Sequence, residues 1–161
     1  MKDLLEKLSS YNLFNNLFPG IIFVIATNKL TNYNFAQDNL ILGVFLYYFI
    51  GLVINRIGSL LIEPLLKKIS FVKFVEYNKY VIASQKDATI IILSEINNMY
   101  RTICALFVVI IILKVYEKFE SIIIGLSNWR IEILILILLL LFLFSYRKQT
   151  KYIHERVNAN I

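Results

Sequence analysis

An unbroken run of twelve Ile, Leu and Phe residues, from Ile133 to Phe144, limits the folds open to this chain more than any other feature. A bilayer core is crossed by about 20 mostly apolar residues in a helix, and this run supplies most of that length. The whole chain of 161 residues is 58% hydrophobic and only 17% charged, whereas soluble domains carry about 25% charged residues. The sequence therefore predicts an all-α integral membrane protein.

Hydropathy predicts a single membrane domain with four transmembrane helices, at residues 17–34, 39–55, 102–116 and 131–146. Residues 39–55 contain no charged residue, and Trp129 and Tyr146 bracket the last span at the expected headgroup levels. Residues 1–16 carry Leu and Phe at helical spacing and predict an amphipathic helix in the interface. Pro19 is expected to begin the first span.

The positions of the Lys and Arg residues predict the orientation. Thirteen of the 17 lie in residues 1–16, 56–101 and 147–161, and the other four are Lys29, Lys114, Lys118 and Arg130. The positive-inside rule then places both termini and residues 56–101 in the cytoplasm of a bacterium, with the protein in its inner membrane. The net charge of +6 is explained by this topology, which argues against nucleic acid as a partner.

Residues 56–101 are predicted to form a cytoplasmic helical hairpin that extends the second and third spans as a stalk. Pro64 should kink the outgoing helix. Ser84 and Asp87 resemble a capping box, which predicts that the returning helix begins at Ser84.

Lysines alternate with aromatic residues in the first part of this segment. We interpret the set either as a membrane-surface contact or as a docking face for a cytosolic partner protein, with nucleic-acid binding a distant third. Its members are Lys67, Lys68, Phe71, Lys73, Phe74, Tyr77, Lys79 and Tyr80.

Two further patterns suggest contacts between helices. Small and polar residues form a stripe on the second span, which favours close helix packing over the alternative of lining a pore in an oligomer; they are Tyr47, Gly51, Asn55 and Gly58. Four charged residues could clamp the stalk, or act as a latch that a partner opens; they are Arg56, Glu63, Glu95 and Arg101.

The sequence argues against an enzyme. One cysteine and one histidine cannot form a metal cluster, and no motif predicts a metal or a cofactor. The exception is Arg147 followed by His154, which matches the loose Arg and His pattern of HEPN ribonucleases. Such a short pattern has a high false-positive rate.

Four blocks of sequence resemble those of a small family of uncharacterised bacterial membrane proteins: YNLFNNLFPG, YYFIGLVINRIGSLLIEPLLKK, SEINNMYRT and SYRKQTKYI. The layout is also similar to small membrane components of antiphage systems, such as the membrane subunit of Kiwa or the accessory membrane proteins of type VI CRISPR loci. The resemblance implies an inner-membrane homo-oligomer that senses a disturbance, recruits an effector or permeabilises the membrane.

Our leading hypothesis is a non-enzymatic, oligomeric sensor or anchor in the bilayer that engages a cytosolic partner through its basic stalk, in antiphage defence. The alternatives are a pore-forming effector and a membrane-tethered ribonuclease acting through Arg147 and His154.

Overall fold

The computed structural model describes residues 13–123 and 125–159, and within these ranges it is a bundle of helices without strands. Four continuous helical stretches are long and apolar enough to cross a membrane: Leu13–Leu30, Leu40–Lys68, Thr89–Ile122 and Leu126–Asn158. The fold class is therefore confirmed, and these helices indicate a multi-pass membrane protein. Most of the predicted amphipathic helix at residues 1–16 lies outside the described residues.

The first stretch starts before the proline that was expected to begin it. Residues Leu13–Leu17 form a π-helical turn, η1, which continues directly into α2, Phe18–Leu30. Pro19 lies in the first turn of α2, directly after the π turn, which adjusts the helix at the residue that has no N–H to donate. Residues 13–16 thus belong to the first membrane helix, and Asn15 and Asn16 are both buried.

The second stretch bends through a π-helical turn at the position of the second proline. Helix α3, Leu40–Ile57, begins with Asn39, whose side chain accepts hydrogen bonds from the backbone N–H groups of Ile41 and Leu42. The π turn η2, Gly58–Ile62, follows, and then the short helix α4, Glu63–Lys68, with Pro64 near its start. Inside an α-helix a proline ring collides with the carbonyl of the preceding turn. A π turn before the proline shifts the backbone hydrogen bonds by one residue and so makes room for the ring.

The returning helix begins later than the capping-box pattern predicted. Helix α5, Tyr77–Lys86, includes Ser84, whose hydroxyl donates to the carbonyl of Val81 rather than capping a new helix. The long helix α6 runs from Thr89 to Ile122, and the carboxylate of Asp87 accepts a hydrogen bond from the backbone N–H of Thr89. The capping-box prediction was therefore wrong about Ser84, because the chain turns at Asp87.

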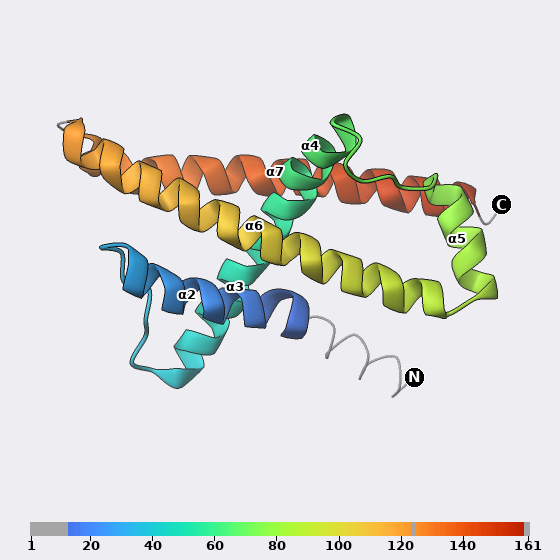
Figure 1. Ribbon diagram of the computed structural model, residues 1–161, viewed down its shortest axis with the longest axis horizontal. Helices are drawn as coiled ribbons and strands as arrows, with labels where there is room; N and C mark the ends of the chain where they lie inside the picture. Colours follow the sequence, from blue (N-terminus) through green and yellow to red (C-terminus); the bar gives the residue numbers. More distant parts are fainter. Residues whose placement is uncertain (1–12, 124, 160–161) are drawn as a thin grey trace.

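The last helix is longer than the predicted span. After the turn at Gly125, which has a positive φ of 91°, and the short 3-10 helix η3, Leu126–Trp129, helix α7 runs from Arg130 to Asn158. Figure 1 shows α6 and α7 extending to the same end of the molecule, where α5 lies, while the turns that join α2 to α3 and α6 to α7 lie at the other. We call these the basic end and the far end.

The apolar core joins the first three membrane helices. Buried side chains of α2, α3 and α6 meet there: Phe23, Val24, Ile54, Ala105, Leu106 and Ile110. Helix α7 takes little part in this core and buries only Leu141 and Ser145. Its contact with α3 includes the stacked rings of Phe49 and Phe142, whose centroids lie 6.1 Å apart.

Two glycines allow the first two helical stretches to touch. A Cβ atom on Gly51 would overlap the carbonyl oxygen of Asn16, and one on Gly20 would overlap the carbonyl oxygen of Tyr47. Close backbone approach of this kind is the role of small residues in membrane helices.

We therefore expect Gly51→Ala to destabilise the protein by about 1–3 kcal/mol through overpacking, lowering the midpoint of thermal unfolding in detergent. Gly43→Ala is a matched control on the same helix, because its new Cβ would lie 3.4 Å from the Tyr47 ring, an ordinary contact. An equal loss in both variants would contradict this account of Gly51.

Candidate functional site

A buried carboxylate at the start of α4 holds side chains from three helical segments together. Glu63, whose side chain is 7% exposed, accepts from Arg101 Nη1 at 2.7 Å, from Lys67 Nζ at 3.0 Å and from Lys148 Nζ at 3.4 Å. Lys67 belongs to α4, Arg101 to α6 and Lys148 to α7. We call these four residues the Glu63 cluster.

A chain of hydrogen bonds leads from this cluster toward the first helix. Arg101 Nη2 donates to Asn55 Oδ1 at 3.0 Å, and Asn55 Nδ2 donates to Asn16 Oδ1 at 3.1 Å. Asn16 Nδ2 then donates to the hydroxyl of Tyr48 at 3.2 Å. A buried amide side chain needs several partners, and this chain supplies them to both asparagines.

Two further contacts surround this chain. Thr102 is fully buried, and its hydroxyl lies 3.2 Å from Asn15 Oδ1 and 2.8 Å from the carbonyl of Asn98. Lys148 Nζ donates to the carbonyl and the hydroxyl of Ser59, at 2.7 and 2.8 Å. The π turns thus contribute polar partners, Asn15 and Asn16 from η1 and Ser59 from η2.

Only part of the predicted clamp is assembled. Glu63 and Arg101 form an ion pair, but neither Arg56 nor Glu95 forms one within the described residues. Lys148 of α7 also pairs with Glu63, although the predicted clamp contained only residues of the stalk hairpin. Its spacing from Leu141 and Ser145, the buried residues of α7, puts all three on one helical face, which is the pattern that could have revealed it.

The stripe on α3 faces helices of the same chain. Gly51 lies against Asn16, Asn55 bonds to Asn16 and Arg101, and Gly58 lies near Arg101 and Ala105 of α6. The hydroxyl of Tyr47 accepts from the backbone N–H of Gln37 at 3.2 Å. These residues therefore have packing partners inside the bundle.

The predicted set of lysines and aromatic residues is divided between internal contacts and the surface. Lys67 lies 4.0 Å from the centroid of the Phe74 ring, and Tyr77 stacks on Tyr152 of α7 with centroids 5.1 Å apart. Tyr80 packs near Tyr77, and Lys79 pairs with Glu76 at an exposed position. Lys68, Phe71 and Lys73 are exposed.

Arg147 and His154 are both exposed on α7. They stand two turns apart, and His154 Nε2 lies 3.1 Å from Asn158 Nδ2. Among the described residues no group of three or more His, Cys, Asp or Glu side chains could hold a metal ion.

A second polar cluster lies at the far end. Glu120 of α6 accepts from the hydroxyl of Tyr33 at 2.7 Å and from Arg130 Nε and Nη2 at 2.9 and 2.6 Å. The Arg130 guanidinium also lies 5.2 Å from the centroid of the Tyr33 ring. Burial, reinforced by the hydrogen bond to Glu120, raises the pKa of Tyr33 to about 12. We call Tyr33, Glu120 and Arg130 the Tyr33 cluster.

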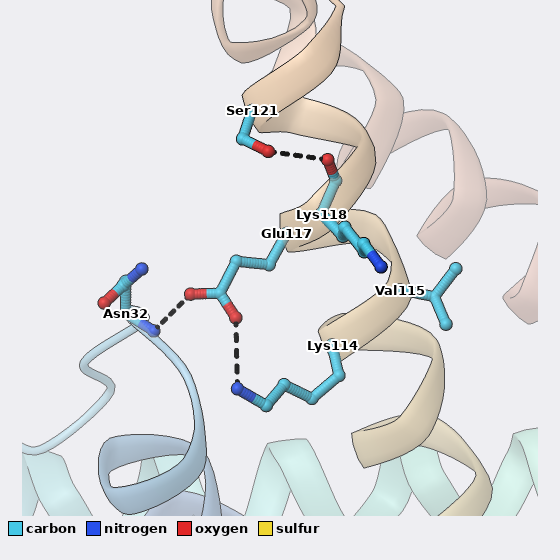
Figure 2. Close-up of a pocket in the computed structure, with 6 residues that line it drawn as sticks. All are labelled: Asn32, Lys114, Val115, Glu117, Lys118 and Ser121. Atoms are coloured by element: carbon cyan, nitrogen blue, oxygen red, sulfur yellow. Dashed lines mark hydrogen bonds and ion pairs between the residues drawn. The ribbon is translucent and has the colours of Figure 1, made fainter.

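An open cavity of about 630 Å³ lies beside this cluster. Figure 2 shows Glu117 between the backbone of Asn32, which donates to it at 2.9 Å, and Lys114, whose Nζ lies 3.7 Å away. Lys118, Ser121 and Val115 complete its lining. The carboxylates of α6 thereby tie the loop after α2 to the far end of the bundle.

The sequence matches no family model, and no curated protein and no solved structure is similar to it at a significant level. The interpretation of both clusters accordingly depends on their chemistry.

Removing the central carboxylate should destabilise the bundle. Glu63→Gln would leave three buried or partly buried cations without their counter-charge, and breaking a buried ion pair costs about 3–5 kcal/mol. We expect its unfolding midpoint in detergent to fall well below that of Glu76→Gln, which removes an exposed carboxylate paired with Lys79 and should cost about 0–1 kcal/mol. Similar midpoints for the two variants would contradict the central role of Glu63.

The Tyr33 cluster predicts that the stability of the protein depends on pH in the alkaline range. Because the folded pKa of Tyr33, about 12, lies above the ordinary value of about 10, its contribution to stability is complete below pH 10 and is lost as the pH rises toward 12. The tyrosinate absorbance of the native protein minus that of Tyr33→Phe should therefore show a midpoint near 12. A midpoint near 10 would contradict both the burial of Tyr33 and its hydrogen bond to Glu120.

Proposed function

We propose that this protein is a non-enzymatic membrane sensor or anchor that engages a cytosolic partner through the segment of residues 65–75, which we call the docking segment. The observation that carries the proposal is that this segment is fixed to the bundle while its apolar side chains face outward. Phe71 and Val75 are 76% and 69% exposed.

The docking segment is held by contacts at both ends. Lys67 bonds to Glu63 and covers the Phe74 ring, and α5, which follows, is tied to α7 by the stacking of Tyr77 on Tyr152. Figure 1 shows the chain between α4 and α5 running from α4 toward the basic end, where α5 lies. Ser70 follows the end of α4 and adopts a positive φ of 59°, which redirects the chain toward α5.

The composition of the exposed face fits a protein partner. Leu65 and Ile69 add to the apolar surface, and Lys68 and Lys73 are exposed among them. A cluster of large apolar side chains held outside the core, with charged neighbours, is typical of interaction sites. A partner with an apolar patch bordered by carboxylates would complement it.

The orientation supports the same proposal. The thirteen basic residues of the tails and of residues 56–101 favour a cytoplasmic location for the docking segment under the positive-inside rule. The Glu63 cluster then lies at the base of the docking segment, where binding could alter the ion pairs that join α4, α6 and α7. In this proposal the ion pair of Glu63 and Arg101, the part of the predicted clamp that forms, acts as a latch that partner binding opens.

The alternatives stay predictions without a structural observation in their favour. The stripe proposed to line a pore contacts the chain's own helices. The residues proposed for ribonuclease activity, Arg147 and His154, stand on the open surface of one helix. A role in antiphage defence and assembly into a homo-oligomer stay predictions from the resemblance.

Photo-crosslinking in cells tests the proposal. A crosslinking amino acid at Phe71 or Val75 should give one adduct of defined mass, larger than a dimer of this chain. The same residue at Tyr146, which is 75% exposed at the end of the apolar part of α7, is the control and should give lipid adducts.

Lys73→Glu should reduce the protein adduct at Phe71 while membrane insertion stays normal. Lipid adducts alone at Phe71 would overturn the proposal in favour of a membrane-surface contact.

A further inference from the structure

The Glu63 cluster carries more positive than negative charge. Lys67, Arg101 and Lys148 surround one carboxylate, so three positive groups and one negative group leave a net charge of +2. Compensating charge is expected where cations are withdrawn from water. The side chains of Arg101 and Lys148 are only 16% and 22% exposed.

Donor groups in this cluster remain available. Arg101 Nε is buried without a hydrogen-bond partner among the described residues, although a guanidinium has five N–H donors. Lys67 contributes one of its three N–H groups to Glu63, and its side chain is 42% exposed. The cluster is therefore open toward the surface on the side of Lys67, where a second anion could approach.

The surroundings of the cluster indicate what kind of anion this is. Lys148 follows directly after the apolar part of α7, and Phe144, one turn earlier on the same helix, is 53% exposed. Ile137, three turns before Lys148 on the same face of α7, is also 53% exposed. Cations therefore lie next to an apolar surface, at the level where a span ends and headgroups begin.

We propose that the Glu63 cluster binds the phosphate of an anionic phospholipid, whose acyl chains lie along the exposed apolar surface of α7. Lys67 is the entry contact, and Arg101 and Lys148 supply the charge behind it. Arginine and lysine are the side chains that bind phosphate through charge-assisted hydrogen bonds. Basic pockets between membrane helices on the cytoplasmic side recognise headgroups in this way.

The net charge of +2 on the Glu63 cluster favours an anionic phospholipid over other ligands that contain phosphate. A zwitterionic phospholipid has the same phosphodiester but adds no net negative charge, so it would leave the excess of +2 uncompensated. Free inorganic phosphate has the charge but no acyl chains to cover the apolar surface. Phosphatidylglycerol has both, and it is the probe for the experiment.

The test measures thermal unfolding of the full chain in mixed micelles as a function of added lipid. Phosphatidylglycerol should raise the unfolding midpoint in a saturable manner, whereas phosphatidylcholine at the same mole fraction should not. Lys67→Gln should require about fivefold more phosphatidylglycerol for half of the effect, the factor that corresponds to one lysine near an anionic surface. Native mass spectrometry should show correspondingly less retained lipid.

Lys79→Gln is the matched control, because Lys79 is also paired with a glutamate but is 72% exposed and lies outside the cluster. It should respond to phosphatidylglycerol as the unmodified protein does. An equal response of the Lys67→Gln and unmodified proteins would overturn the site. An equal effect of inorganic phosphate would overturn the lipid as its ligand. Both results concern the lipid alone, because the purified protein is measured without a cytosolic partner.

Discussion

The carboxylate of Glu63 organises the contacts among α4, α6 and α7. A buried charge is costly unless it is paired and hydrogen-bonded, so this side chain requires cations from α4, α6 and α7 at defined positions. Replacing such a group by apolar residues is often neutral or stabilising. We therefore attribute to Glu63 a role in fixing the relative positions of the helices. Apolar helix surfaces can pack in several registers, whereas a buried carboxylate is stable only where cations and hydrogen-bond donors surround it.

The same requirement explains the buried asparagines. Asn55 connects Arg101 to Asn16, so the position of α6 is linked to that of η1 through polar contacts within an apolar bundle. Gly51 and Gly20 allow the backbones to come close enough for these contacts. Both π turns precede a proline and both contribute polar side chains, Asn16 and Ser59, to this region. Local departures from α-helical geometry thus supply groups that a regular helix would direct elsewhere.

Hydropathy alone predicted the four membrane helices, because the need to satisfy backbone hydrogen bonds in lipid leaves few alternatives to a helix. The pair of Glu63 and Arg101 was also accessible, since both are charged residues close to predicted spans. Lys148 was missed because a lysine after a span is expected to anchor it at the surface. Asn15 and Asn16 were assigned to an interfacial helix, and nothing local in the sequence shows that the membrane helix starts before Pro19. The Ser84 capping box failed because Ser84 lies in the last turn of α5 and Asp87 is the residue that ends that helix, so the pair marks the end of a helix and not the start of one.

Helix α6 runs without interruption from Thr89 to Ile122. It carries Arg101 in the Glu63 cluster and Glu120 in the Tyr33 cluster, residues that a rise of about 1.5 Å each places roughly 28 Å apart along one axis. The buried middle of the helix lies around Ala105 and Leu106, about 7 Å from Arg101 and about 22 Å from Glu120 along the axis. A tilt of α6 about its middle would therefore move Glu120 about three times as far as Arg101, and in the opposite direction, so the Tyr33 cluster is the more sensitive of the two to such a movement.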